Sequence, residues 1–181
     1  MRTILCALTV CGTILYGCAD PMNRATSHNY TTACAAAERS GRYDVAEQAC
    51  YRALANVDWV NLPLELQSRK MYNLARIKKQ LSKHDEAEVL LKQALALEEE
   101  LPQPSDIRIG RRLIELSANL AGQGKWSEGA AYLKRALPIL GQYSGSERNY
   151  ADEVIALYGA HFVGKSGDGL ASLNGSRIKT P

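Results

Sequence analysis

The sequence repeats itself at an interval of 41 to 42 residues, and this interval is the feature that most limits the folds open to it. Small residues recur in register at three positions of the unit, and leucine recurs at a fourth. The recurring sets are Cys34, Ala75 and Ser117; Ala46, Ala87 and Gly129; Ala53, Ala94 and Ala136; and Leu54, Leu95 and Leu137. A further step of 42 residues reaches Gly159, so a degraded fourth unit is expected after the first three.

Small residues at fixed positions indicate close crossings between antiparallel helices, because a short side chain lets two helices approach while the neighbouring leucines fill the next layer. Alanine and leucine are abundant and favour helix. Proline, which interrupts helical hydrogen bonding, stands at 63, 102 and 104, where connections are needed. The predicted fold is therefore all-α, with helices at about 28–40, 43–56, 64–81, 84–101, 105–122, 126–141 and 147–163.

Two of the predicted turns carry a glycine, a basic residue and an aromatic residue, as in Gly41-Arg42-Tyr43 and Gly124-Lys125-Trp126. Together with the small residue after each turn and the Ala-Leu pair closing each unit, this pattern resembles the tetratricopeptide (TPR) repeat. The resemblance implies a right-handed helix-hairpin solenoid of about three TPR-like units plus a degraded fourth, and a role in binding proteins. The interval exceeds the family's usual ~34 residues, and Ser82 replaces the turn glycine of the second unit. A helical bundle with coincidental spacing is the alternative.

The N-terminus has the features of a secretion signal. Arg2 is followed by a mostly apolar run at 3–16, which is too short to span a membrane as a helix. The next residues, Leu15-Tyr16-Gly17-Cys18, resemble the lipobox of bacterial lipoproteins. This resemblance implies cleavage before Cys18 and acylation of that cysteine, for example by palmitate. An ordinary signal peptide is the alternative, since Tyr16 is unusual at its position.

These patterns divide the chain into four parts. They are a lipoprotein signal peptide at 1–17, a lipidated cysteine with a tether at 18–27, a TPR-like domain at 28–163 and a Gly/Ser-rich flexible tail at 164–181. Several acyl chains hold a protein at a membrane almost permanently. Ala19 after the cysteine implies the periplasmic face of the outer membrane, whereas Asp20 leaves the inner membrane open.

Two cysteines fall within the first predicted hairpin. Cys34 takes the small central position of one helix, and Cys50 lies on its antiparallel partner. Their spacing suits facing sides of the hairpin, and the periplasm permits disulfides. A Cys34–Cys50 disulfide is therefore one prediction, and two buried free thiols are the alternative.

A stripe of basic and aromatic residues follows one face of a predicted first helix. Arg69, Tyr72, Arg76 and Lys79 recur at helical spacing, and Arg111 takes the position of Arg69 in the next unit. Because first helices line the inner groove of TPR proteins, the resemblance implies contact with an acidic or extended peptide. A solvated helix face is the alternative. The run Glu98-Glu99-Glu100 is also expected to be a solvated helix end.

One motif suggests enzymatic chemistry. Residues 159–166, GAHFVGKS, fit the nucleotide-binding pattern GxxxxGK[ST], and Val154–Tyr158 resemble a preceding strand. Only fifteen residues follow, which is too few for an α/β sheet, so the match is interpreted as coincidence. No metal-ligand pattern appears, so no metal and no cofactor are expected. Without Arg2 the net charge is only +2, which gives no reason to expect nucleic acid.

The function predicted from these features is a membrane-anchored scaffold that holds an envelope protein, with no small-molecule substrate and no enzymatic activity. A structural, self-associating envelope protein is the second hypothesis, since the degraded fourth unit leaves an uncapped end. An enzyme, supported only by residues 159–166, is the third.

Overall fold

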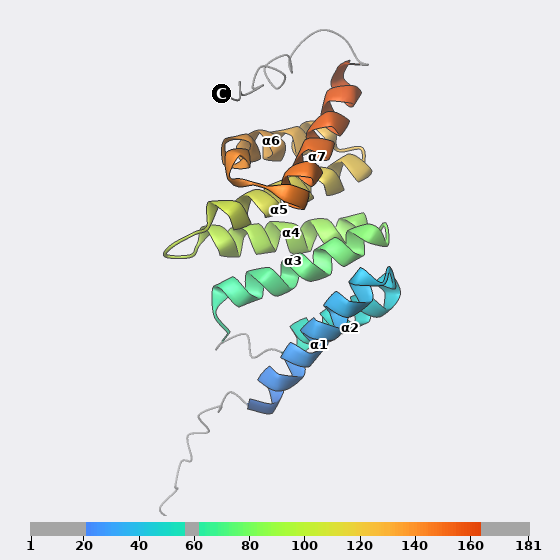
Figure 1. Ribbon diagram of the computed structural model, residues 1–181, viewed down its shortest axis with the longest axis vertical. Helices are drawn as coiled ribbons and strands as arrows, with labels where there is room; N and C mark the ends of the chain where they lie inside the picture. Colours follow the sequence, from blue (N-terminus) through green and yellow to red (C-terminus); the bar gives the residue numbers. More distant parts are fainter. Residues whose placement is uncertain (1–20, 57–61, 164–181) are drawn as a thin grey trace, which may run out of the picture.

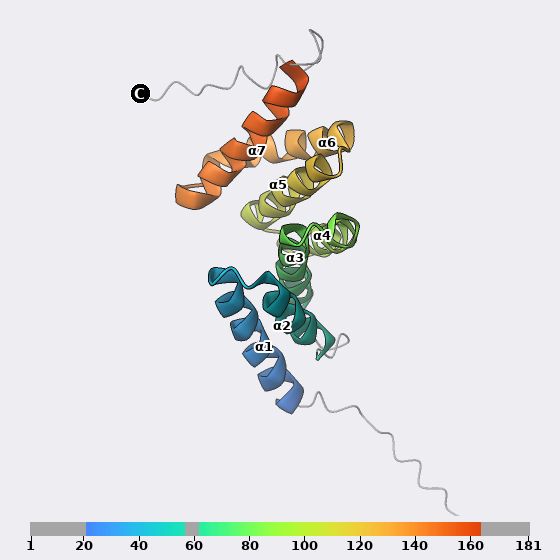
Figure 2. The same cartoon turned by 90° about the vertical axis from the view of Figure 1, so that its right-hand side faces the viewer.

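The computed structural model describes residues 21–56 and 62–163. The predicted signal peptide, Cys18 and the predicted tail lie outside these ranges. All regular structure in the described ranges is helical, which confirms the predicted all-α solenoid (Figures 1 and 2). The elements are α1 (Pro21–Arg39), α2 (Tyr43–Ala55), α3 (Leu64–Gln80), α4 (His84–Glu99), α5 (Asp106–Gly122), α6 (Trp126–Ala136), the 3-10 helix η1 (Leu137–Gln142) and α7 (Gly145–Val163).

The helices pair into antiparallel hairpins that stack in the order of the chain along the long axis of the molecule (Figure 1). α1 packs on α2, α3 on α4, and α5 on α6. Each hairpin contacts the next through α2 and α3 or through α4 and α5, and α7 closes the stack against α5. In the described part of the chain, no helix is long and apolar enough to cross a membrane.

Two boundaries differ from the sequence-based expectation. α1 begins at Pro21, so residues 21–27, which the sequence assigned to a tether, are helical. Ser27 is buried there, and its hydroxyl donates a hydrogen bond to the carbonyl of Ala53 at 2.7 Å. The helix expected to reach residue 141 ends at Ala136 and continues as η1, because Pro138 has no amide hydrogen to donate.

The recurring small residues are buried at the helix crossings, as the repeat predicts. In the first three units, all nine small positions are buried, and six of them are fully covered: Ala46, Ala75, Ala87, Ala94, Ser117 and Ala136. The fourth unit differs, because Gly159 is only half-buried and its neighbour Tyr158 is the residue that is fully enclosed. The last unit therefore packs by a large side chain where the others pack by small ones.

The three turns within the hairpins share one backbone conformation. Gly41, Ser82 and Gly124 have φ angles of 69°, 58° and 72°, in the left-handed region. After each of them the next amide donates to a carbonyl five residues back, as Lys83 does to Lys78 at 2.9 Å. Ser82 thus keeps the turn that the glycines make, at a steric cost that glycine avoids.

We expect Ser82→Gly to raise the free energy of unfolding by about 0.5–1 kcal/mol, because it relieves the left-handed strain at the cost of some unfolded-state entropy. Urea unfolding followed by circular dichroism measures the change. The matched control is Gly41→Ser, which has open space around its Cβ position and should lower stability by a similar amount. Equal stability of both variants and the parent would contradict the strain argument.

Gly129 in the third unit replaces the alanine that the first two units have at the same position, Ala46 and Ala87. The packing of Tyr158 explains this difference. A Cβ atom at Gly129 would lie 1.7 Å from the Tyr158 hydroxyl oxygen. That hydroxyl donates a hydrogen bond to the Ser117 carbonyl at 2.8 Å, and the tyrosine is fully buried, so it has little room to move. α7 therefore docks on the α5–α6 hairpin through a tyrosine that only glycine accommodates.

We expect Gly129→Ala to lower the free energy of unfolding by about 2–3 kcal/mol through this overpacking. Adding Tyr158→Phe removes the clashing oxygen and should recover part of the loss, which a double-mutant cycle in urea will show. The control is Gly159→Ala, whose added Cβ meets nothing within 4 Å and should leave stability equal or higher.

Candidate protein-interaction groove

The predicted basic and aromatic stripe lines a groove of about 540 Å³ along the first helices of successive units. Arg69, Tyr72, Arg76 and Lys79 come from α3, and Arg111 comes from α5. The structure therefore brings all five predicted residues to one concavity. The further lining residues, which complete it from α3, α5, α7 and the segment that leads into α7, are Asn73, Gln80, Arg108, Arg112, Ile114, Glu115, Tyr143, Ser146, Glu147 and Tyr150.

Two of these additional residues, Arg108 and Glu115, can be recognised from their spacing in the sequence. Arg108, Arg111 and Glu115 recur at i, i+3 and i+7, which is the same helical spacing as Arg69, Tyr72 and Arg76 one unit earlier. The contribution of the segment before α7 had no such signal, because it depends on how α7 docks. Tyr143 shows this, since its hydroxyl fills the space beside Gly110, where a Cβ would lie 2.2 Å away.

A network of three polar side chains joins the first helices inside the groove. The Lys79 ammonium lies 2.6 Å from a Glu115 carboxylate oxygen and donates to the Tyr150 hydroxyl at 2.7 Å. Lys79 and Glu115 keep only 14 % and 5 % of their side-chain surface exposed. Burial raises the pKa of Tyr150, and the negative charge of Glu115 adds to the effect, so the phenol stays protonated at neutral pH. Side chains of α3, α5 and α7 are thereby fixed to one another.

A second network joins α3, α4 and α5, and two of its members, Arg108 and Arg112, line the groove. The Arg112 guanidinium contacts Glu98 at 3.0 Å and donates to the Ser68 hydroxyl at 2.9 Å. The other Glu98 oxygen accepts from Arg108 at 2.5 Å, and Ser68 donates to the Ala94 carbonyl at 2.7 Å. Arg112 and Glu98 are 2 % and 0 % exposed. Burial lowers the pKa of Arg112, and Glu98 opposes this by its charge.

The position of Glu98 corrects the expectation of a solvated helix end. Glu99 and Glu100 are exposed as expected, but Glu98 is enclosed. It follows the buried Leu91 and Ala94 by seven and four residues, so helical periodicity places it on the buried face of α4. A buried carboxylate needs cationic partners, and α5 supplies two of them.

The Ser68 bond repeats a contact of the first unit that the sequence analysis did not identify. Ser27 and Ser68 are one interval apart, and each donates to the carbonyl of its unit's recurring alanine at 2.7 Å. One further interval reaches Gly110, where the serine is absent and the Tyr143 ring occupies the space. At the equivalent crossing, the first two units thus have a serine hydrogen bond, and the third has a tyrosine ring packed beside a glycine.

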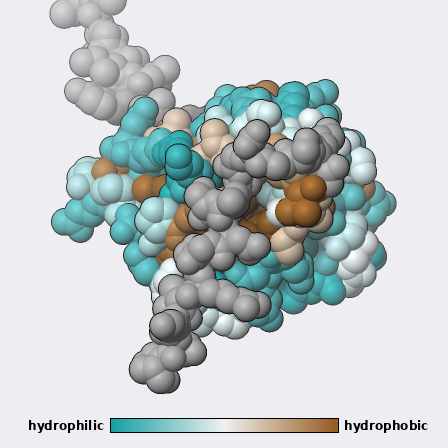
Figure 3. Space-filling view, turned by 90° about the horizontal axis from the view of Figure 1, so that it is seen from above, coloured by the Kyte–Doolittle hydropathy of each residue, from teal (hydrophilic) through white to brown (hydrophobic). Residues whose placement is uncertain are grey.

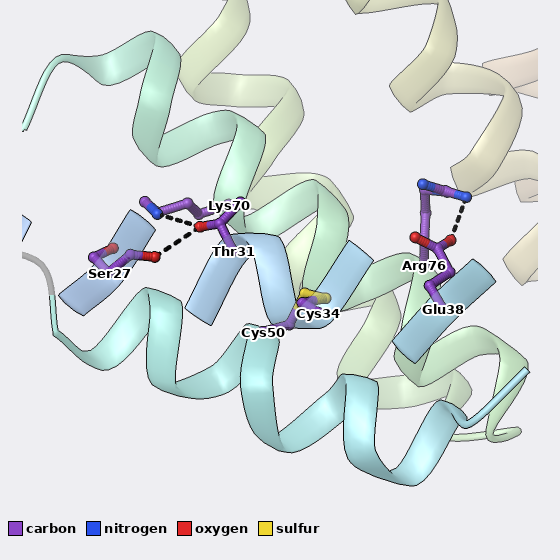
Figure 4. Close-up of a disulfide and its surroundings, with 7 residues drawn as sticks. All are labelled: Ser27, Thr31, Cys34, Glu38, Cys50, Lys70 and Arg76. Atoms are coloured by element: carbon purple, nitrogen blue, oxygen red, sulfur yellow. Dashed lines mark hydrogen bonds and ion pairs between the residues drawn. A yellow bond between two sulfur atoms is a disulfide. The ribbon is translucent and has the colours of Figure 1, made fainter. Parts of the chain in front are cut away.

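The first hairpin is joined covalently and is held to the second by polar contacts (Figure 4). Cys34 of α1 and Cys50 of α2 form a disulfide with their Cα atoms 5.2 Å apart. On one side of it Lys70 donates to the Thr31 hydroxyl at 3.0 Å, and on the other Arg76 donates to Glu38 at 2.6 Å. Burial, together with the charge of Arg69, lowers the pKa of Lys70.

The other predicted sites are the nucleotide-like motif at 159–166 and the lipidation site at Cys18. Val154–Tyr158, which resembled a strand, lie within α7, and so do residues 159–163 of the nucleotide-like motif. Residues 164–166 of that motif, like Cys18, lie outside the described ranges. Within those ranges, no group of three or more His, Cys, Asp or Glu side chains is arranged to hold a metal ion.

No protein-family model matches the sequence, and no curated protein does so at the significance required. Among solved structures, the chain is similar to a protein from Podosopora anserina described as a kinesin light chain with nearly identical TPR-like repeats. The TM-score is 0.60 and the identity 18 %, over 77 % of this chain and 68 % of that chain. The likeness shows the fold: this chain has a TPR-like helical-repeat fold.

We expect Arg112→Met to lower the free energy of unfolding by about 3–5 kcal/mol, because it leaves Glu98 buried without one of its two cations. Combining it with Glu98→Leu should recover much of the loss. The matched control is Arg135→Met, which breaks the exposed pair with Glu99 and should cost under ~1 kcal/mol. Similar losses in Arg112→Met and Arg135→Met would contradict a special role for the buried pair.

Proposed function

We propose that this chain is a protein-interaction scaffold that binds an extended segment of a partner protein in the groove between α3, α5 and α7. The observation that supports this most is that one groove crosses α3, α5 and α7, which are the first helices of successive units. Each unit therefore contributes a different set of side chains to the lining. Such a surface offers an extended peptide many contacts in a fixed order. The polar lining favours recognition of a particular sequence over general apolar adhesion.

We further propose that the scaffold is a lipoprotein anchored through Cys18 at the periplasmic face of the outer membrane, where it holds an envelope protein. The lipobox-like residues 15–18 support this part of the proposal. α1 begins at Pro21, three residues after Cys18, so an anchored domain would lie close to the bilayer. The fold itself gives no reason to expect catalysis.

Site-specific photocrosslinking in living Gram-negative cells tests the groove. A benzophenone amino acid at Gln80, which is exposed and lines the groove, should capture a discrete envelope protein. The matched control is the same change at Gln93, which is also exposed, on α4, and lies outside the groove lining. The same adducts from both positions would count against a binding groove.

The anchor is tested in the same cells with Cys18→Ser. We expect this variant to leave the membrane fraction and to lose the Gln80 adduct with an envelope partner. Unchanged membrane fractionation would contradict the lipoprotein assignment, while leaving the groove result intact.

A second candidate function, self-association, is favoured by the exposed end of the solenoid. Leu157 and Val163 of α7 are 46 % and 82 % exposed. Figure 3 looks onto this end and shows hydrophobic residues gathered within a largely hydrophilic face. Sedimentation equilibrium separates the two functions, since a monomer at all concentrations excludes self-association.

A further inference from the structure

The groove is lined by six cationic side chains and two anionic ones, and the cations differ in how firmly the fold holds them. The cationic residues are Arg69, Arg76, Lys79, Arg108, Arg111 and Arg112. The anionic ones are Glu115 and Glu147. A cation that is enclosed with its carboxylate partner has a structural task, whereas an exposed one is available to a ligand.

Three of the cations are enclosed with carboxylates of the fold, and a fourth, Arg76, is paired with Glu38 of the first hairpin. Arg112 and Arg108 share the buried Glu98, and Lys79 is enclosed with Glu115. Displacing either carboxylate would leave its charge buried without a partner, so these pairs resist exchange.

Arg69 and Arg111 behave differently, although they occupy the same position in consecutive units. Arg69 is exposed, and none of the ion pairs in the described ranges includes it. Arg111 is paired with Glu147 of α7, but 40 % and 42 % of these side chains are exposed. Exposed pairs of this kind are weak and exchange readily with other charges.

The Arg111 guanidinium also has a hydrogen-bond donor without an acceptor in the described part of the chain. Glu147 contacts its Nη2 atom, while its Nε atom is buried and has no hydrogen-bond acceptor in the described part of the chain. Nε and Nη2 lie on one edge of the guanidinium, and a carboxylate that docks on that edge accepts from both. An incoming carboxylate would thus satisfy a donor that Glu147 leaves unpaired.

We propose that the groove recognises an acidic peptide segment, that Arg69 and Arg111 each bind one of its carboxylates, and that Glu147 is an internal competitor which the ligand displaces from Arg111. This inference rests on the proposed function and names the chemistry of its ligand. Because the two arginines are one repeat apart, they bind two separated acidic residues of one extended chain. Glu147 then selects against weakly charged segments, because a ligand must compete with it.

Fluorescence anisotropy with defined peptides tests the proposal. The probes are a fluorescein-labelled Glu-Ser repeat peptide and its Gln-Ser counterpart, added to the full chain carrying Cys18→Ser. We expect the Glu-Ser peptide to bind more tightly, and its affinity to fall as salt rises. Arg69→Gln and Arg111→Gln should each weaken binding about tenfold, the value of one charge-assisted contact. Glu147→Gln should tighten it about threefold by removing the competitor.

The matched control is Glu99→Gln, which breaks a similarly exposed arginine pair, with Arg135, outside the groove and should leave affinity unchanged. Melting temperatures of all variants show whether a change in binding reflects a loss of folding. Equal binding of both peptides, or equal effects of Glu147→Gln and Glu99→Gln, would overturn the inference. If the Gln80 crosslinks persist in that case, the groove still binds a partner, and only the acidic chemistry is wrong.

Discussion

The structure depends on the close approach of paired helices at a few very small residues. Ala46, Ala87 and Gly129 lie at equivalent crossings, and each leaves room for the helix opposite. Because the crossings recur along the chain, the hairpins stack one on the next, and α3, α5 and α7 line one groove. The placement of Arg69 and Arg111 on neighbouring units of that groove follows from this stacking. A larger residue at one crossing would shift every unit beyond it relative to those before.

The features that recur in the sequence were predictable, and those that depend on a single tertiary contact were not. The hairpins, the crossings and the position of Ser82 in a glycine turn follow from the interval alone. The early start of α1 did not, because residues 21–27 are mostly polar and are held by a hydrogen bond from Ser27 that no local pattern reveals. The burial of Glu98 follows from its position on the helix, whereas its charged neighbours Glu99 and Glu100 predict a solvated end. The five predicted groove residues share a concavity as expected, but the way α7 closes it depends on how Tyr158 fits beside Gly129.

The charged groups of the groove fall into two populations with different physical roles. Buried networks around Glu98 and Glu115 fix the helices relative to one another, at a cost in desolvation that their mutual attraction offsets. Exposed arginines above them are held weakly or not at all. A rigid base that carries adjustable charges suits recognition, because the ligand meets a surface that is already in place and has only side chains to rearrange.

The disulfide of the first hairpin has a mechanical consequence. Cys34 and Cys50 are separated by 16 positions in sequence, and the bond between them joins α1 directly to α2. When tension enters at the N-terminal end and leaves through the later units, the covalent bond carries it past the turn at Gly41. The segment between the two cysteines then bears no load and cannot be drawn out. Force therefore cannot unfold the tip of the first hairpin, although this hairpin is nearest to the point of pull. Extension must begin in the parts of α1 and α2 outside the disulfide or in the units that follow.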